Sequence, residues 1–232
     1  MKEIEKLQSI IDKSEHIVFF GGAGVSTASG IPDFRGAHGL YSIAPEELVS
    51  HHYFMSNPKE FFDFYFSKMV YEDAKPNACH NYLAELEKKK DVWIITQNID
   101  GLHQKAGSKN VIELHGTTLK NHCMECGKFY SLDELNKEDI PKCDCGGIIK
   151  PDVVLYEEPL DETSITEAIK KISNADTLIV AGTSLAVYPA ASFIYYFNGN
   201  NLITINKSSI SADKNATLVL HEDINEIFSN LK

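Results

Sequence analysis

A short apolar run that leads directly into a glycine-rich segment constrains the fold of this chain more than any other feature. Residues 17–20 are hydrophobic on both faces, as in a buried strand, and the segment GGAGVSTASG follows at residues 21–30. A strand, a glycine-rich turn and then a helix open the βα units that bind nucleotides. Glycines let backbone amides approach a pyrophosphate, and the helix start adds the positive end of its dipole. The same turn can also reflect tight packing alone, so by itself this segment is a weak signal.

Further apolar runs repeat the strand pattern along the chain. They are short and cover residues 92–96, 111–114, 178–181, 202–205 and 218–220. Helical patterns lie between several of them, at 77–89 and 163–174, and apolar residues at helical spacing predict one more helix over 3–14. This alternation predicts an α/β fold with a Rossmann-like parallel sheet that is covered on both faces. We therefore expect the ligand at the carboxyl ends of the strands.

Two segments depart from this alternation. Residues 36–76 are rich in aromatic side chains and contain three prolines, which indicates a helical insertion, and residues 119–150 hold most of the cysteines and few core residues. We expect the two segments to form a smaller zinc-binding and helical domain. The Rossmann NAD-binding domain would then comprise residues 1–35, 77–118 and 151–232.

Four of the five cysteines lie close together in the second of these segments. Cys123 and Cys126 form one pair, Cys143 and Cys145 form another, and Cys79 stands apart. Four thiolates provide the closed tetrahedral shell of a structural zinc ion, whereas a catalytic zinc keeps an open position. We predict one zinc ion held by these four cysteines. The neighbouring His122 could compete as a ligand but is not needed, and Cys79 is expected to be a small buried residue.

The composition restricts the partners of the chain. Its formal net charge of −11 argues against binding to the phosphate backbone of a nucleic acid and suits a basic partner. No apolar run is long enough to cross a bilayer, and the charged start does not resemble a signal peptide. The default expectation is a cytoplasmic protein without membrane contact.

The glycine-rich segment lacks one glycine of the dehydrogenase fingerprint. The pattern G-x-G-x-x-G would start at Gly22 and Gly24 and end at position 27, which is Thr27. No acidic residue closes the second strand at the usual ribose-binding place, and residues 30–35 (GIPDFR) follow as a flap over the cofactor. The loop is therefore expected to bind a dinucleotide, but hydride transfer is disfavoured.

Two strand ends carry polar side chains that suit a site. Gln97, Asn98 and Asp100 follow the run 92–96, and His115 ends the run 111–114. Polar groups at strand ends usually line a site, although Asn98 or Asp100 could equally cap a helix over 101–105. His115 is placed to act as a general base near neutral pH. The other histidines are expected to be structural or solvated, at positions 16, 38, 51, 52, 80, 103 and 221.

These segments together resemble the motifs of the sirtuin family, in the same order along the chain. The matching segments are GAGVSTASGIPDFRG, TQNIDGLHQKAG, ELHGT, the two cysteine pairs, KPDVVLYEE, GTSLAVYP and the Ile-Asn pair at 205–206. The resemblance runs from Phe19 to Ile224, and the short termini are similar to those of bacterial and archaeal members. It implies a large Rossmann domain, a small zinc and helical domain, and a cleft between them that NAD and an acyl-lysine peptide enter from opposite sides.

The resemblance also implies a role for each matching residue. The pyrophosphate and the nicotinamide would contact Gly22, Ala23, Gly24, Ser26, Thr27, Phe34 and Arg35. Gln97 would contact the ribose, and the carboxamide pocket would consist of Asn98, Ile99 and Asp100. The adenosine half would contact Gly182, Thr183, Ser184, Asn206, Asp223 and Ile224, and the peptide channel would be lined by Val154, Tyr156, Glu157, Glu158 and Val187.

The activity so implied is NAD-dependent protein lysine deacylation, with acetyl as the first choice of acyl group. NAD would be consumed as an electrophile, and His115, assisted by Asn98 and Asp100, would deprotonate a ribose hydroxyl. The products would be lysine, nicotinamide and O-acyl-ADP-ribose. Two other hypotheses stay open, namely a protein mono-ADP-ribosyltransferase on the same scaffold and a non-catalytic NAD-sensing module.

Two features of the implied peptide channel bear on its substrate. Sirtuins often have Phe-Gly-Glu where this chain has Tyr156, Glu157 and Glu158, so an acidic residue that favours basic sequence around the lysine replaces a glycine. No Tyr-x-x-Arg pair, which resembles the reader of acyl carboxylates in some relatives, occurs in residues 48–60. We therefore expect neutral acyl groups on the substrate lysine.

Overall fold

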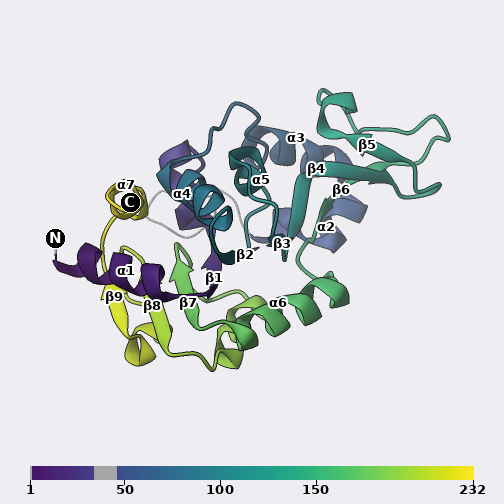
Figure 1. Ribbon diagram of the computed structural model, residues 1–232. Coiled ribbons are helices and arrows are strands. Elements are labelled where there is room, and N and C mark those ends of the chain that lie inside the picture. The colour runs from purple at the N-terminus through teal and green to yellow at the C-terminus, as the bar shows by residue number, and fades with distance from the viewer. Residues whose placement is uncertain (1, 34–45) are drawn as a thin grey trace.

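The computed structural model describes residues 2–33 and 46–232, and the chain forms a large α/β part with a smaller part beside it (Figure 1). The large part is built on one six-stranded parallel sheet in the order β3-β2-β1-β7-β8-β9. Its strands are β1 (His16–Gly21), β2 (Asp91–Thr96), β3 (Val111–Glu113), β7 (Thr177–Ala181), β8 (Asn201–Ile205) and β9 (Leu218–Leu220). The predicted Rossmann-like sheet is therefore confirmed, and each predicted strand lies within one residue of its expected bounds.

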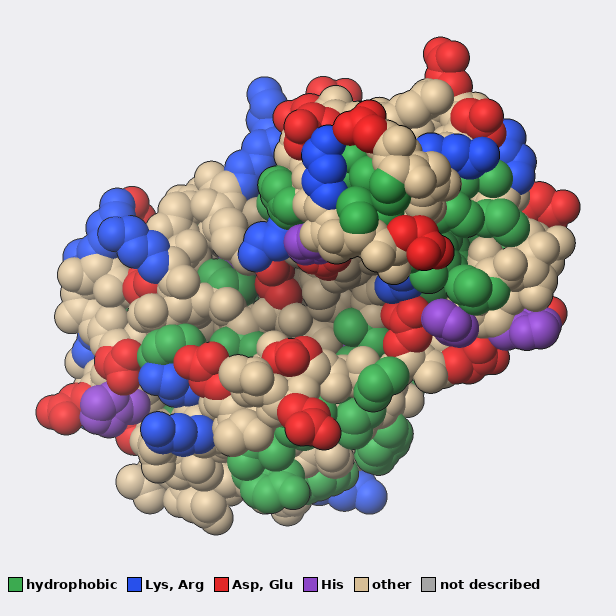
Figure 2. Space-filling model, turned by 90° about the vertical axis from the view of Figure 1, so that its right-hand side faces the viewer, with side chains coloured by type: hydrophobic (Ala, Val, Ile, Leu, Met, Phe, Trp, Pro, Cys, Tyr) green, Lys and Arg blue, Asp and Glu red, His purple; other side chains and the backbone are tan. Residues whose placement is uncertain are grey.

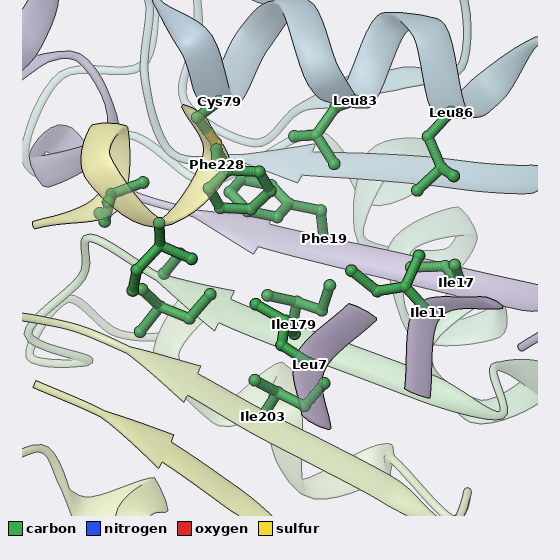
Figure 3. Packing of buried hydrophobic residues seen from close by; sticks show 14 of the residues in the cluster. Leu7, Ile11, Ile17, Phe19, Cys79, Leu83, Leu86, Ile179, Ile203 and Phe228 are labelled. Atoms are coloured by element: carbon green, nitrogen blue, oxygen red, sulfur yellow. The ribbon is translucent and has the colours of Figure 1, made fainter. Parts of the chain in front are cut away.

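Helices cover both faces of the sheet because its strands are apolar on both faces. One face carries α1 (Lys2–Lys13), α4 (Ala78–Glu87) and α7 (Ile224–Ser229), and the other carries α6 (Glu162–Asn174) and the 3-10 helix η6 (Ala190–Tyr196). Alternate residues of β1 point into the two cores: Phe19 packs with the first set of helices and Phe20 with the second. Figure 3 shows Phe19 surrounded by side chains of the first set, including Leu83 and Phe228. The predicted helices at 3–14, 77–89 and 163–174 are confirmed, with bounds that differ by one or two residues.

The smaller part combines helices with a three-stranded antiparallel sheet. Its helical half contains η4 (Glu46–Val49), α2 (His51–Ser56) and α3 (Pro58–Lys68), whose aromatic side chains form a separate core. Its sheet has the order β5-β4-β6 and consists of β4 (Gly116–Cys123), β5 (Phe129–Ser131) and β6 (Ile149–Val153). The 3-10 helix η5 (Leu132–Glu134) follows β5 directly. The predicted helical insertion is confirmed for residues 46–76, and residues 36–45 lie outside the described part.

Two strands of the smaller part continue into the large part. The predicted domain boundaries after residues 118 and 150 fall inside β4 and β6, so both strands connect the two parts. The exact division of the chain into domains stays a prediction.

The segment after the glycine-rich loop differs from the prediction. Two short 3-10 turns, η1 (Ala23–Val25) and η2 (Thr27–Ser29), follow β1 instead of an α-helix. Gly30 adopts the left-handed conformation with φ of 86° and ends the second turn. The expectation of a helix dipole at this loop is therefore wrong, because no α-helix begins within residues 22–33.

The remaining short helices are α5 (Leu102–Ala106) and η7 (Ser211–Asn215).

No helix within residues 2–33 and 46–232 has the length and apolar character needed to cross a membrane. The cytoplasmic location stays a prediction.

Two buried histidines pack against each other between α4 and α5, with their rings tilted. The rings of His80 and His103 lie 4.6 Å apart at their centroids, and their residues are 0% and 1% exposed. The amide of Asn77 donates to Nδ1 of His80, whereas neither ring nitrogen of His103 has a partner within the described residues. Burial lowers the pKa of His80 to about 4 and places the pKa of His103 well below its ordinary value. Both rings are therefore neutral in the folded protein near neutral pH.

We expect acidification to destabilise the fold through this pair. Because the folded pKa values lie below the unfolded value of about 6.5, the unfolded chain binds more protons between pH 6.5 and 4. The free energy of unfolding should fall as pH falls through this window, by on the order of 3 kcal/mol for His80 alone. Urea unfolding at a series of pH values measures it. His80→Gln keeps an acceptor for the Asn77 amide but cannot titrate, so its dependence should be shallower; an equal slope in both proteins contradicts the assignment.

Candidate active site and metal centre

The candidate site lies where the order of the sheet reverses, at the carboxyl ends of β1 and β7. The loops that follow these strands are in contact: the Gly22 amide donates to the Ala181 carbonyl at 3.1 Å, and the Gly24 amide donates to the Gly182 carbonyl at 2.8 Å. A Cβ atom on Gly24 would lie 2.7 Å from Cα of Gly182. Tight packing alone thus requires glycine here, and the same packing leaves the strand ends open for a ligand.

A cavity of about 820 Å³ opens at this point, between the large and small parts of the molecule. Figure 2 shows a hollow between an upper and a lower lobe, with acidic side chains along its rims. Most of the predicted site residues line the cavity: Gly22, Ala23, Gly24, Thr27, Gln97, Asn98, Ile99, His115, Val154, Tyr156, Glu157, Glu158, Gly182, Thr183, Ser184, Val187, Asn206, Asp223 and Ile224. Residues from both strand ends and from the predicted peptide channel therefore meet in one space.

Some predicted site residues lie elsewhere. Ser26 is only 1% exposed and does not line the cavity. Asp100 lines a second cavity of about 380 Å³, next to α5 and the zinc-bearing sheet. Phe34, Arg35 and His38 lie outside the described residues.

Other residues that line the main cavity were not predicted from the sequence. They include Asp33, Val49, Met69, Leu160, Glu162, Ile165, Tyr188, Asn225 and residues 207–210. Residues 207–210 follow β8 closely, so the strand-end rule applied to the run 202–205 would have found them. The others come from segments that reach the cavity only through the tertiary fold.

His115 is oriented by a backbone contact that fixes its tautomer. Its Nδ1 lies 2.9 Å from the carbonyl oxygen of Gln97. Because a carbonyl oxygen only accepts, Nδ1 carries the proton and Nε2 keeps its lone pair. Burial lowers the pKa of His115, against the hydrogen bond to Gln97, which raises it. The imidazole is therefore neutral near pH 7 and has a basic nitrogen at the cavity.

Ser26 links the two polar residues of the neighbouring strand end. Its hydroxyl donates to Oδ2 of Asp100 at 2.6 Å and accepts from Nδ2 of Asn98 at 3.1 Å. The other oxygen of Asp100 accepts from the Leu102 amide at the start of α5. Asp100 thus accepts from the first amide of α5, although the N-cap residue is Gly101 rather than Asn98 or Asp100, and it also belongs to a buried polar network. Burial raises the pKa of Asp100, against the hydrogen bonds from Ser26 and Leu102.

A second network lies at the far end of the cavity, near the ends of β7 and β8. Gln97 donates from Nε2 to the Thr183 hydroxyl at 3.0 Å, and the Thr183 amide donates to Oδ1 of Asn206 at 2.9 Å. Nδ2 of Asn206 is buried and has no partner within the described residues. Lys207 pairs with Asp223 at 2.9 Å, and this contact lowers the pKa of the Asp223 carboxyl.

The segment after β6 is fixed by the helical insertion. The His51 amide donates to the Tyr156 carbonyl at 2.9 Å, and the Tyr156 amide donates to the Val49 carbonyl at 3.0 Å. The Glu158 carboxylate lies 2.8 Å from Nδ1 of His51 and 3.0 Å from Nζ of Lys150. These contacts hold one wall of the cavity against the smaller part.

The four clustered cysteines have the geometry of a single metal site. Their sulfur atoms all lie within 4.8 Å of one another, with Cys123 and Cys145 at 3.4 Å and Cys126 and Cys143 at 3.6 Å. A tetrahedral zinc ion with bonds of about 2.3 Å places its sulfur ligands about 3.8 Å apart. The four cysteines are therefore positioned to bind one zinc ion, and no open position is left for catalysis.

Two turns shape this centre. The Gly127 amide donates to the Cys123 carbonyl, and the Gly146 amide donates to the Cys143 carbonyl, so each cysteine pair closes a turn that ends on a glycine with positive φ. Backbone hydrogen bonding from Cys145 and the Tyr130 hydroxyl lower the pKa of Cys143 to about 6, which favours the thiolate that binds metal. His122 does not join the centre, because its Nδ1 lies 2.7 Å from Asp152. Cys79 is fully buried in the first core, as expected.

Comparison with known proteins agrees with this geometry. The model of the Sir2 family matches residues 22–189. The chain belongs to the Sir2 family. Among its curated relatives, the NAD-dependent protein deacetylases of Clostridium perfringens and Clostridium tetani are 56% and 55% identical to this Sir2 chain. The matches cover 99% and 98% of this chain and 98% and 96% of the relatives. The Staphylococcus aureus strain Mu50 protein of the same name is 46% identical over 99% of this chain and 98% of its own length.

Solved structures of Sir2 proteins have the same fold. A Sir2 structure with a deacetylated p53 peptide and 3'-O-acetyl ADP-ribose matches with a TM-score of 0.92 and 38% identity, over 98% of this chain and 96% of that one. A Sir2 structure with a p53 peptide and NAD matches with a TM-score of 0.87 and 39% identity, over 97% of this chain and 95% of that one. The sirtuin resemblance seen in the motifs is therefore confirmed.

We expect a cysteine substitution to abolish zinc binding by this Sir2 chain. Cys143→Ser removes one ligand of a closed shell, so bound zinc should drop from one equivalent to a trace, and the thermal midpoint should fall because metal binding contributes to folding. Elemental analysis of the purified protein measures the zinc. Cys79→Ala is the matched control, since it removes the cysteine that lies in the core and should keep one equivalent. A full zinc complement in Cys143→Ser contradicts the ligand set.

Proposed function

We propose that this chain is an NAD-dependent protein lysine deacetylase that transfers the acyl group to ADP-ribose and releases nicotinamide. The observation that carries the proposal is the orientation of His115, whose basic Nε2 is left free by the contact of Nδ1 with the Gln97 carbonyl at 2.9 Å. His115 lines one cavity together with the glycine loop and the segment after β6. A single base is thus placed between a dinucleotide site and a peptide site.

The residues of the cavity fit NAD. Gly22 and Gly24 line the cavity at the strand ends, where a pyrophosphate could approach the backbone. The buried Nδ2 of Asn206 lacks a partner, and a ribose hydroxyl would satisfy it. Gln97, Thr183 and Asn206 are already ordered by mutual hydrogen bonds, so little ordering is needed on binding.

The segment after β6 fits a peptide strand. The carbonyl of Val154 and the amide of Glu157 form no hydrogen bond within the described residues. Free backbone groups at the edge of a cavity are what an added peptide backbone pairs with. We infer that an acyl-lysine peptide binds along residues 154–158, opposite Val187, with its modified side chain directed towards His115.

Each polar residue then has a distinct task. Bound NAD supplies an electrophilic ribose carbon once its bond to nicotinamide weakens. Nε2 of His115 takes a proton from a ribose hydroxyl, because burial keeps the ring neutral near pH 7. Asn98 lines the cavity and would hold the nicotinamide end, while the buried Asp100 positions Asn98 through Ser26. The zinc centre maintains the small part of the fold and takes no part in the reaction.

The test of the proposal is incubation with an acetyl-lysine peptide and NAD. We expect the deacetylated peptide, nicotinamide and O-acetyl-ADP-ribose in equal amounts, with inhibition of the reaction by added nicotinamide. Mass spectrometry of the peptide and chromatography of the nucleotides measure these products. Acetyl release without NAD, or labelled ADP-ribose left on protein with no acyl-ADP-ribose, would sink the deacetylase assignment; the second result identifies an ADP-ribosyltransferase.

Removing the proposed base should slow the reaction and leave the fold intact. We expect His115→Ala to lower kcat by about 10²- to 10⁴-fold, the usual contribution of general base catalysis. The exposed His16 at the start of β1 provides the control, since His16→Ala should keep the activity. Burial lowers the pKa of His115. As pH falls, kcat/KM should therefore drop to half its maximum at a pH below about 6.5, the ordinary pKa of histidine. A midpoint above that value argues against this base.

A further inference from the structure

We propose that Glu157 and Glu162 select acyl-lysine substrates with basic residues beside the modified lysine. This inference rests on the proposed function and names the class of peptide that the same cavity takes. The modified lysine itself is uncharged, so any charge preference must act on its neighbours in the peptide.

Glu157 is held at the mouth of the cavity by its own carboxylate. Its backbone has φ of 77°, a left-handed conformation that is unfavourable for a residue with a side chain. The Oε2 atom accepts from the His52 amide in the first turn of α2 at 2.9 Å. Glu157 remains exposed and lines the cavity. The side chain is therefore anchored through one oxygen, and the carboxylate charge faces the peptide site.

Glu162 adds a second charge from a different element. It occupies the first turn of α6, is exposed, and lines the same cavity. Within residues 2–33 and 46–232, neither Glu157 nor Glu162 forms an ion pair with a basic side chain. Two uncompensated carboxylates from separate segments thus line the cavity into which the peptide fits.

Two other acidic side chains of the cavity are compensated by basic partners. Glu158 pairs with Lys150 and His51, and Asp223 pairs with Lys207. Lys207 is the one lysine or arginine among the described residues that line the cavity, and its charge is engaged with Asp223. Glu157 and Glu162 are thus two acidic residues of the cavity without a basic partner among the described residues.

A peptide that pairs its backbone with residues 154–158 brings the residues that flank its modified lysine close to Glu157, because an extended peptide advances only about 3.3 Å per residue. Lysine or arginine at those positions gains an exposed charge pair, and glutamate meets repulsion. An exposed pair contributes about 0.2–1 kcal/mol, which corresponds to about a 1.4-fold to fivefold change in KM for each glutamate. The effect should appear in KM rather than kcat, because these side chains lie away from the reacting atoms.

The experiment compares three acetyl-lysine peptides that differ only in the residues flanking the lysine: arginine, alanine and glutamate. KM and kcat are measured with NAD for the unaltered protein, Glu157→Gln, Glu162→Gln and the double variant. Glutamine keeps an oxygen for the His52 amide, so the fold at residue 157 should persist, and thermal melting checks it. We expect the arginine peptide to have the lowest KM, and this preference to shrink about 1.4-fold to fivefold in each single variant and further in the double variant.

Glu167→Gln is the matched control. Glu167 is also exposed on α6 but does not line the cavity, so this variant changes the net charge equally and should keep the full preference. Raised salt should weaken the preference of the unaltered protein, because exposed charges are screened. If all three peptides are deacetylated with equal KM, or the preference survives in the double variant, this inference is wrong while the proposed function stands. If no peptide is deacetylated with NAD, the proposed function itself fails.

Discussion

The close contact between the loops after β1 and β7 is the constraint on which the rest of the site depends. The parallel register pairs Gly21 with Ala181, so both strands end at the same level and their loops must pass each other at once. Gly22 and Gly24 make this possible, because a Cβ atom on either would lie within 2.8 Å of the opposite loop. The backbone of two neighbouring strand ends is thereby exposed at a single point, where a dinucleotide can reach it.

The second constraint is the way the smaller part is joined to the sheet. Gly116, with φ of 75°, pairs with Val153 at the junction, and a Cβ atom there would lie 1.8 Å from the Asp152 carbonyl. The Val154 amide donates to the His115 carbonyl at 3.0 Å, next to this pair. The proposed base is therefore fixed from two sides, by Gln97 of the large sheet and by the segment that leads to the peptide site. A shift of the segment after β6 would therefore also move the backbone of His115.

The zinc centre and the aromatic core divide the task of stabilising that smaller part. Its sheet is short, and β5 has only three residues, so the four cysteines supply cross-links that a small core cannot. The helical half instead packs Phe54, Phe61, Phe62 and Tyr65 against Val153 and Leu155. Because Val153 ends β6 and Leu155 lies in the proposed peptide channel, this aromatic core supports the channel directly.

The sequence by itself determined the strands, the metal ligands and the catalytic candidate, because each is written in local patterns. Apolar runs mark strands buried on both faces, cysteine spacing marks a metal shell, and polar residues just after apolar runs mark strand ends. Only the tertiary structure decided that Ser26 joins Asn98 to Asp100, since Ser26 lies more than 70 positions before both of them in the chain. It also decided that 3-10 turns replace a helix after the glycine loop, and that Glu157 adopts a positive φ held by the His52 amide. Such features depend on what a distant segment places opposite a residue, and no local pattern carries that information.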